Sequence, residues 1–265
     1  MKLGTVPDSG SSETGERWPG LATAAAERAV VLTSVQVEKL TTYRDLLLSW
    51  NARFNLTAIT DPVDVDRRLI LDAVQMLPAV DRHLAAGDSV VDIGSGGGVP
   101  AIPLAVLRPD LSFTLIEATG KKVTFLNAVA KELGLHRLTA LHGRAEEFGQ
   151  DDGYRGRFHA GTARAVSSLP ALIELLMPLV EVGGVALLPK GLEITGELEA
   201  GREAALLLNA SIIESDVMPG GESRLVVVRK TGPTPARYPR RAGIPAREPI
   251  GSSLLQPRSG SGASA

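Results

Sequence analysis

The spacing of apolar residues first indicates a helical segment near the start of the chain. Between residues 33 and 54, apolar positions recur every three or four residues with charged residues between them, which predicts an amphipathic helix. Thr33 and Gln36 stand in the capping-box positions at its start. A second helix is predicted after Asp61, an N-cap residue followed by proline. We therefore expect a helical cap over residues 29–82.

From residue 83 onwards, short apolar runs alternate with helical stretches. The predicted strands lie at residues 89–93, 112–118, 138–144, 158–164, 185–191, 211–218 and 224–230. Such alternation is typical of a mainly parallel sheet with right-handed crossovers. A helix is expected from Leu169 to Val182, and the short turn before the last strand makes that strand antiparallel. The predicted fold is α/β, a Rossmann-like domain with a mainly parallel seven-stranded sheet over residues 83–232.

Composition limits the other properties of the chain. Residues 1–28 and 251–265 are rich in small and polar residues, which predicts disordered tails. No apolar run approaches the roughly 20 residues that span a bilayer, and the first residues do not resemble a signal peptide. We therefore expect a cytoplasmic protein with no membrane partner. A monomer is expected, although the sequence carries no signal for the oligomeric state. The absence of cysteine excludes disulfides, thiolate metal sites and a cysteine nucleophile, and no metal is expected.

Aromatic residues are scarce, at 4% of the chain. Tyr43, Trp50 and Phe54 fall within the first predicted helix, where Trp50 and Phe54 continue its apolar stripe. These three side chains are expected in the core of the cap rather than on a surface that stacks on nucleic-acid bases.

Positive charge is concentrated near the C-terminal end. The formal net charge is −2, but residues 224–247 contain arginines and lysines and no acid. A block of one sign beside a balanced domain is typical of a phosphate-binding surface, although a solvated basic tail would give the same pattern. A basic extension is expected over residues 233–250.

The stretch VVDIGSGGGVP joins the first predicted strand to a glycine-rich turn. A P-loop would need Gly-Lys-Ser/Thr, and a dinucleotide turn would need glycine where Val99 stands. Instead, Asp92 precedes Gly94, Gly96 and Gly98, a spacing that resembles the first motif of class I S-adenosylmethionine-dependent methyltransferases. Backbone amides beside the glycines can meet the carboxylate of that cofactor. Asp92 can meet its cationic or hydroxyl groups.

Two further positions agree with this cofactor. Glu117 ends the second predicted strand, where an acid would accept hydrogen bonds from both ribose hydroxyls, a role shared with NAD enzymes. Ala145 and Glu146 follow the third strand, where folds of this kind usually contact adenine.

The residues after the fourth strand restrict the methyl acceptor. Without cysteine, carbon-5 methylation of pyrimidines is excluded, and the segment reads TARA rather than the Asn/Asp-Pro-Pro-aromatic motif used on exocyclic amines. A ring nitrogen with a free lone pair, such as guanine N7, needs orientation and desolvation but no base. Arg164 in this segment could hold a phosphate or guanine O6 with two donors.

Several motifs in order resemble the ribosomal small-subunit methyltransferase G family, also called glucose-inhibited division protein B. They are WNARFNLTAITDP, the glycine-rich stretch, LIEATGKKVTFLNAVAKELGL, GRAEEF, TARAVSSL, LLPKG and ARYPRRAGIPAREPI. The resemblance spans about residues 33–250. It implies that S-adenosylmethionine is the donor and that N7-methylguanosine is formed in the decoding-region loop of 16S ribosomal RNA, free or in the small ribosomal subunit.

The resemblance also implies roles for individual residues. The cofactor pocket would comprise Asp92, Gly94, Gly96, Gly98, Glu117, Ala145, Glu146 and Arg164. A basic rim facing the RNA would comprise Lys121, Lys122, Arg144, Lys190 and Arg224. Arg164 is the catalytic candidate. Lys121 and Lys122 could instead be solvated helix residues, and Arg144 could pair with Glu146 or Glu147.

The chain departs from the family pattern at several positions. Members usually have Arg-His-Ile-Leu-Asp-Ser in the second cap helix, whereas Leu69 and Ala73 stand here in place of the histidine and serine. His159 replaces the usual aspartate at the fourth strand, and Ala101 replaces a glycine after the glycine-rich turn. Two other hypotheses therefore stay open: a methyltransferase acting on a small molecule, and a non-catalytic RNA-binding paralogue.

Overall fold

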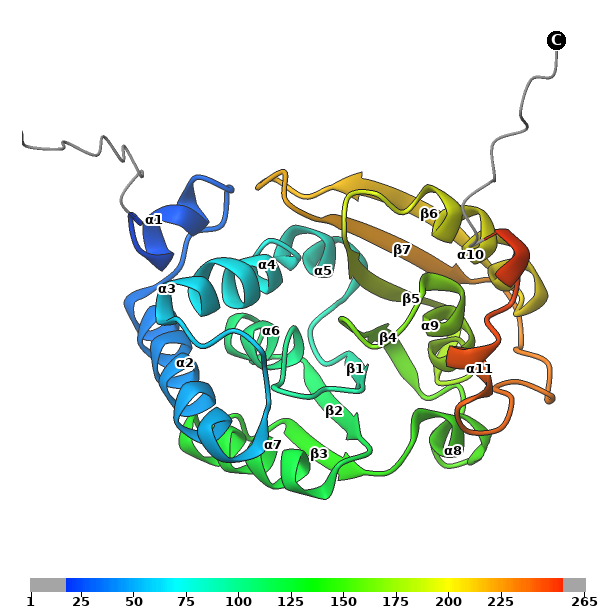
Figure 1. Ribbon diagram of the computed structural model, residues 1–265, viewed down its shortest axis with the longest axis horizontal. Coiled ribbons are helices and arrows are strands. Elements are labelled where there is room, and N and C mark those ends of the chain that lie inside the picture. Colours follow the sequence, from blue (N-terminus) through cyan, green and yellow to red (C-terminus); the bar gives the residue numbers. More distant parts are fainter. Residues whose placement is uncertain (1–17, 255–265) are drawn as a thin grey trace, which may run out of the picture.

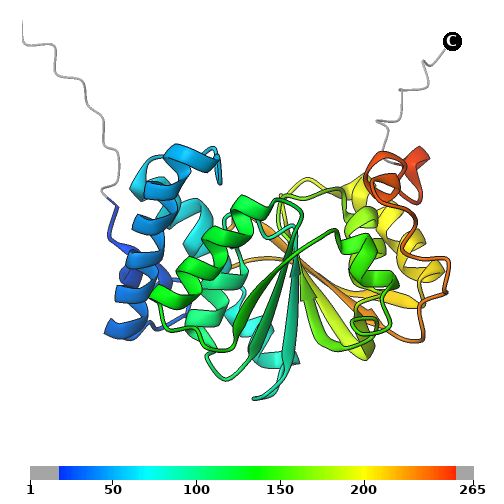
Figure 2. The same cartoon turned by 90° about the horizontal axis from the view of Figure 1, so that it is seen from below.

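The computed structural model describes residues 18–254, which form a seven-stranded sheet with helices on both faces (Figures 1 and 2). The strand order is β3-β2-β1-β4-β5-β7-β6. The strands are β1 Ser89–Ile93, β2 Ser112–Glu117, β3 Leu138–His142, β4 Phe158–Thr162, β5 Val180–Lys190, β6 Ala210–Val217 and β7 Arg224–Lys230.

The direction of the strands confirms the predicted α/β fold. β1 pairs in parallel with β2 on one side and β4 on the other, and β7 is antiparallel to both β5 and β6. The chain runs outward from β1 to β3 and then returns to place β4 on the other side of β1. In such sheets, the crevice at the carboxyl ends of the strands where the order reverses is the usual ligand site.

Helices cover the two faces of the sheet (Figure 2). They are α1 Leu21–Ala26, α2 Ser34–Phe54, α3 Pro62–Val65, a π-helical turn Asp66–Ile70, α4 Leu71–Val74, α5 Leu77–His83, α6 Ala101–Leu107, α7 Gly120–Glu132, α8 Ala145–Gln150, α9 Leu169–Leu176, α10 Thr195–Leu207, α11 Ile244–Arg247 and a 3₁₀ turn Ser252–Leu254. No helix in this described part of the chain is long and apolar enough to cross a membrane.

Alternate residues of each strand pack into one of two cores. Val90 and Leu187 lie in a core with residues of α1, α2, α4, α6 and α7, whereas Val91 and Leu188 lie in a second core with α9 and α10. This alternation follows from the two-residue period of a strand. The sheet is therefore covered on both faces, which explains why its strands read as nearly continuous apolar runs.

The cap helices begin where the sequence indicates. The Thr33 hydroxyl accepts from the Gln36 amide at 3.2 Å, and the Gln36 side chain accepts from the Thr33 amide at 2.9 Å. The Asp61 carboxylate caps α3 by accepting from the Asp64 amide. Since Leu40 and Leu47 of α2 are buried in the same core as α6 and α7, the cap shares its core with the sheet domain.

The predicted boundary of the N-terminal tail is wrong. The tail expected over residues 1–28 contains α1, whose Leu21, Ala24 and Ala25 are buried. This six-residue helix lacks a side-chain cap, so the sequence carries no start signal for it. Residues 1–17 and 255–265, which make up most of the two expected tails, lie outside the described residues, while 252–254 form a 3₁₀ turn.

The helix expected from Leu169 to Val182 ends at Leu176, and β5 begins at Val180. An apolar run of this length does not distinguish a helix from a buried strand. The two glycines that follow the expected helix lie inside β5, beside an irregularity in its pairing with β4. A Cβ atom on Gly184 would lie 2.5 Å from the carbonyl oxygen of His159, so glycine permits the close approach of β4.

The C-terminal extension, residues 233–250, is fixed against α8 and α9 rather than solvated as a tail. The guanidinium of Arg240 contacts both carboxylate oxygens of Glu174, which is fully buried in α9. Arg155 donates to the carbonyl oxygens of Gly149, Thr234, Pro235 and Tyr238. The basic block is therefore partly structural.

We expect Arg240→Ala to lower the free energy of unfolding by about 3 kcal/mol, because it leaves the buried Glu174 carboxylate without its counter-ion. Urea denaturation followed by circular dichroism measures this change. Arg241→Ala is the matched control, since Arg241 is exposed, and its effect should stay within about 0.5 kcal/mol. Equal effects of the two variants would contradict a structural role for the Arg240–Glu174 pair.

Candidate functional site

The glycine-rich turn follows β1 at the point where the strand order reverses. Gly94, Gly96 and Gly98 have positive φ angles of 61°, 53° and 92°, a conformation that other residues adopt only with strain. A Cβ atom on Gly98 would lie 2.3 Å from Ile102 Cδ1, and one on Gly94 would lie 2.7 Å from Val166 Cγ2. The turn therefore needs glycine both for its backbone and for the close approach of its neighbours.

Asp92 is the penultimate residue of β1, two residues before Gly94, and is fully buried. Neither carboxylate oxygen has a hydrogen-bond partner among residues 18–254. Burial, together with the nearby Glu117 charge, raises the pKa of Asp92 from 3.8 to about 8. A buried polar group without a partner is unusual, and this one indicates that a ligand supplies the missing donor.

Glu117 ends β2 and closes the glycine-rich turn. One carboxylate oxygen accepts from the Gly96 amide and the other from the Thr119 amide, each at 2.9 Å. These two bonds fix the plane of a carboxylate that is only 6% exposed. Each oxygen keeps a second acceptor position, so the group can still bind a pair of neighbouring hydroxyls.

The cap contributes Tyr43 to the same turn. Its hydroxyl donates to the Gly97 carbonyl oxygen at 2.6 Å, and burial raises the pKa of this phenol. Tyr43 is a core residue, as the sequence suggests, and Trp50 and Phe54 pack against the same core while partly buried. Periodicity shows only that the Tyr43 side chain faces inward, so the sequence does not reveal its bond to the glycine-rich turn.

Arg164 follows β4, beside Ala165, which has a positive φ of 55°. Its Nε lies 3.2 Å from an Asp72 carboxylate oxygen, and its Nη2 donates to the Arg68 carbonyl oxygen at 2.5 Å. The other Asp72 oxygen accepts from the Ser223 hydroxyl. Arg164 is therefore held by the cap, a contact between segments that are distant in the sequence.

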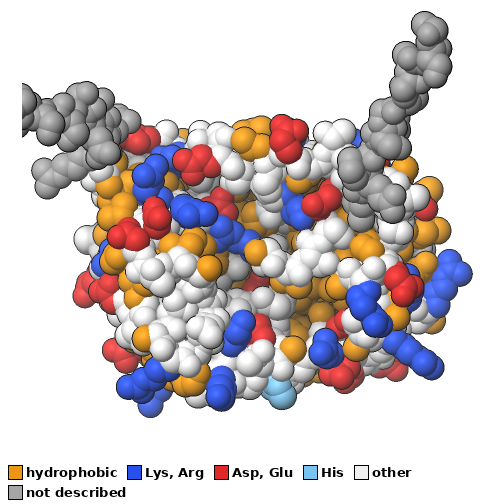
Figure 3. All heavy atoms as spheres, in the orientation of Figure 1, with side chains coloured by type: hydrophobic (Ala, Val, Ile, Leu, Met, Phe, Trp, Pro, Cys, Tyr) orange, Lys and Arg blue, Asp and Glu red, His pale blue; other side chains and the backbone are white. Residues whose placement is uncertain are grey.

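A hollow of about 340 Å³ opens beside Arg164. Its lining includes the cations Arg67, Arg68, Arg164 and Lys190 and the acids Asp72 and Glu222. On the face shown in Figure 3, Lys and Arg side chains lie around a central region that carries few charges. The surplus of cations over acids in the hollow favours an anionic ligand.

The structure separates the residues expected on the basic rim. Lys190 lines the hollow, where it contacts Glu197 at 2.7 Å and the Ser167 carbonyl oxygen at 3.2 Å. Arg224 does not line the hollow, because its guanidinium donates to the Ser215 carbonyl oxygen on β6. A role of Arg224 in RNA binding stays a prediction.

The remaining rim residues are solvent-facing. Lys121 is exposed and lies with its ammonium 6.0 Å from the Phe54 ring centroid, and Lys122 is partly exposed. Arg144 is exposed, and its backbone amide, not its guanidinium, bonds to Glu147. Roles of these three residues in RNA binding stay predictions.

Ala145 and Glu146 begin α8. One Glu146 oxygen accepts from the Gly243 amide at 2.8 Å, so this acid also fastens the C-terminal extension. Their contact with adenine stays a prediction.

Three of the four departures from the family pattern fall in the cap and in β4. Leu69 and Ala73 are buried in the cap, at 9% and 1% exposure, so these positions form packing rather than an RNA-facing surface. His159 lies near the amino end of β4, where its Nδ1 accepts from the Ser89 amide. None of the three lines the hollow beside Arg164.

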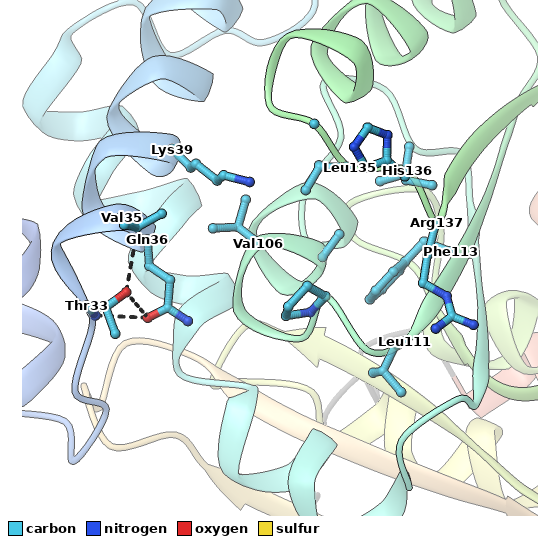
Figure 4. Close-up of a pocket in the computed structure, with 14 residues that line it drawn as sticks. Thr33, Val35, Gln36, Lys39, Val106, Leu111, Phe113, Leu135, His136 and Arg137 are labelled. Carbon is cyan, nitrogen blue, oxygen red and sulfur yellow. Dashed lines mark hydrogen bonds between the residues drawn. The ribbon is translucent and has the colours of Figure 1, made fainter.

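A larger cavity of about 440 Å³ lies at the amino ends of β2 and β3, between these strands and the start of α2. Figure 4 shows Lys39 extending from α2 toward it, with Phe113 and Arg137 across from it. The glycine-rich turn and Arg164 are at the opposite ends of the strands. This cavity is therefore separate from the candidate site.

Comparison with known sequences gives one consistent family. The family model described as rRNA small subunit methyltransferase G matches residues 36–224. The ribosomal RNA small subunit methyltransferase G of Streptococcus pyogenes is 40% identical over 223 residues, 83% of this chain and 93% of the relative. That of Alkaliphilus metalliredigens is 38% identical over 219 residues, 81% of this chain and 91% of the relative.

Solved structures share the fold at low sequence identity. A branched-chain polyamine synthase from Thermus thermophilus matches with a TM-score of 0.52 at 14% identity, over 73% of this chain and 65% of that chain. A chain from the Haloferax volcanii complex of a methyltransferase activator with a methyltransferase matches with a TM-score of 0.50 at 14% identity, over 70% and 98%. These likenesses concern the fold alone.

We expect the buried Asp92 to make the protein less stable as the pH rises from about 4 to about 8. The folded state keeps this carboxyl protonated up to its raised pKa of about 8, whereas the unfolded chain releases the proton near pH 3.8. The unfolded state therefore binds fewer protons in this window, and the free energy of unfolding falls with pH. Denaturation of the wild type and Asp92→Asn without ligand measures the effect.

In Asp92→Asn this contribution is absent, so the stability of the wild type relative to the variant should decline steadily across the window. A stability difference that stays constant between pH 4 and pH 8 would show that Asp92 is ionised in the folded protein.

Proposed function

The chain belongs to the rRNA small subunit methyltransferase G family, and we propose that it uses S-adenosylmethionine to form N7-methylguanosine in the decoding-region loop of 16S ribosomal RNA. The observation that carries the cofactor assignment is the buried Asp92 carboxylate, which has no partner among residues 18–254. Ribosomal RNA is a cytoplasmic substrate, so the proposed site of action is the cytoplasm.

The residues at the glycine-rich turn fit this cofactor. Asp92 can accept from an amino or hydroxyl group, and Glu117 has acceptor positions for the two ribose hydroxyls. Gly94, Gly96 and Gly98 leave the backbone accessible to a ligand. When bound, S-adenosylmethionine supplies an electrophilic methyl group on a positively charged sulfur.

The hollow beside Arg164 is the proposed place for the target nucleotide. Ala165 lines this hollow, and the next residue, Val166, packs against Gly94 of the turn, so the hollow adjoins the proposed cofactor site. An arginine side chain has no acceptor and cannot act as the base that removes a proton. Guanine N7 carries a free lone pair and needs no such removal, so orientation and exclusion of water suffice.

Arg164 keeps one part of its guanidinium for a ligand. Nε and Nη2 contact Asp72 and the Arg68 carbonyl oxygen, whereas no bond of Nη1 is seen within the described part of the chain. Nη1 can therefore donate to a phosphate oxygen or to guanine O6. Because this donor is already in place before the nucleotide binds, it can orient the base without further rearrangement of the protein.

The activity is tested by incubating the protein with methyl-labelled S-adenosylmethionine and 30S subunits, naked 16S RNA or no RNA. We expect labelled N7-methylguanosine in at least one RNA-containing reaction, and about a hundredfold lower turnover in Arg164→Ala. Arg157→Ala is the control, because this exposed arginine directly precedes the opposite end of β4.

Cofactor binding without RNA methylation would contradict the proposed function and favour a binding paralogue. Turnover by Arg164→Ala within a few-fold of the wild type would show that Arg164 is not the critical residue.

The exposed arginines of the C-terminal extension are proposed to contact RNA phosphates. Lys230 and Arg240 are engaged in the fold, whereas Arg237, Arg241 and Arg247 are exposed. Changing these three to Gln should reduce the slope of log affinity against log salt by up to roughly 2–3, since each phosphate that is no longer neutralised lowers the slope by roughly 0.7–0.9.

Filter binding of 16S RNA at several salt concentrations measures the slope. A triple variant with Lys131, Arg157 and Arg202 changed to Gln removes the same charge elsewhere on the exposed surface. Equal slopes for the two triple variants would mean that the extension contributes only net charge.

A further inference from the structure

The cap and the catalytic candidate meet at Asp72. This residue lies in α4, is 9% exposed, and places its two carboxylate oxygens against Arg164 Nε and the Ser223 hydroxyl. Arg164 follows β4, and Ser223 lies in the turn between β6 and β7. Asp72 therefore joins three segments that surround one hollow.

The helix that carries Asp72 has an irregularity directly before it. Residues Asp66–Ile70 form a π-helical turn, and the Leu71 amide bonds to the Asp66 carbonyl oxygen, five residues back. π-helical turns widen a helix locally and are frequent at functional sites. The Arg68 carbonyl oxygen, which accepts from Arg164 Nη2, lies within this turn.

Two partners thus hold the guanidinium. Asp72 forms an ion pair with Nε and the Arg68 carbonyl oxygen accepts a hydrogen bond from Nη2, while Nη1 makes no hydrogen bond or ion pair with residues 18–254. A planar group that is fixed at two of its three nitrogens has little freedom left. The third nitrogen then has a set direction relative to the hollow.

We infer that Asp72 is a positioning residue, which with the Arg68 carbonyl oxygen orients Arg164 so that Nη1 points to the target nucleotide. This inference rests on the proposed function. It makes the cap part of the methyl-transfer machinery. The role of Asp72 is expressed through Arg164, so loss of Asp72 should cost activity only while Arg164 is present.

A double-mutant cycle with Asp72→Asn and Arg164→Ala tests this coupling. In the labelled methylation assay, we expect Asp72→Asn alone to lower kcat at least thirtyfold and to leave the KM for S-adenosylmethionine within threefold. In the Arg164→Ala background, the same change should lower kcat less than threefold further. Independent multiplication of the two losses would overturn the inference, as would wild-type kcat in Asp72→Asn.

Arg108→Gln is the matched control. The Arg108 side chain is also largely buried, at 15% exposure, and also forms ion pairs, at 2.8 Å from Asp81 and 2.6 Å from Asp110. Its loss should lower the melting temperature about as much as Asp72→Asn but keep kcat within threefold of the wild type. Equal losses of kcat in the two variants would mean that breaking any largely buried ion pair disturbs the site.

A measurement that does not depend on enzymatic activity tests this inference separately from the proposed function. In nitrogen-15 NMR spectra, the Arg164 Nη2–H resonance, whose hydrogen donates to the Arg68 carbonyl oxygen, should be distinct and slow to exchange in the wild type and should lose this protection in Asp72→Asn. Unchanged protection would overturn the positioning role. Failure of the wild type to methylate RNA would instead overturn the proposed function and leave this spectral result valid.

If Asp72→Asn does not fold, the variant Arg164→Lys tests the inference instead. Lysine keeps the charge, but its single ammonium cannot reproduce a planar group held at two nitrogens with a third left for the ligand. We expect at least a thirtyfold loss of kcat. Wild-type kcat in Arg164→Lys would overturn the inference.

Discussion

The close approach of several segments to the turn after β1 is the constraint on which the site depends. Gly94 admits Val166 from the segment after β4, Gly97 admits Leu47 from α2, and Gly98 admits Ile102 from α6. A side chain at Gly94 or Gly98 would push its neighbour away, because the distances to a Cβ atom fall below 3 Å. The glycines therefore bring the cap, the sheet and the Arg164 segment together at one edge.

The close packing around the turn also buries the Asp92 carboxyl group, which is electrostatically unfavourable. Burial without a partner opposes ionisation of the carboxyl, whereas the neighbouring Glu117 is satisfied by two backbone amides. The two acids thus have different roles although they stand on adjacent strands. One is already oriented by the protein, and the other awaits a donor from outside it.

Much of this arrangement could be predicted from the sequence, because local signals define it. The capping box at Thr33, the strand–helix alternation and the spacing from Asp92 to Gly98 each depend on residues a few positions apart. Contacts such as Tyr43 with Gly97, Asp72 with Arg164 and Arg240 with Glu174 join residues that are tens of positions apart. No local pattern encodes these contacts. For the same reason, the sequence does not show which arginines of the C-terminal extension are paired within the fold and which are exposed.

The Arg240–Glu174 pair has a consequence for the order in which the chain is completed. Domains begin to fold while synthesis proceeds from the N-terminus, and α9 is made well before residue 240 leaves the synthesis machinery. Until then, the Glu174 carboxylate has no counter-ion at a position that the finished fold buries completely. Closure of the second core around α9 before the last segment arrives would leave this carboxylate buried without its counter-ion, which is unfavourable.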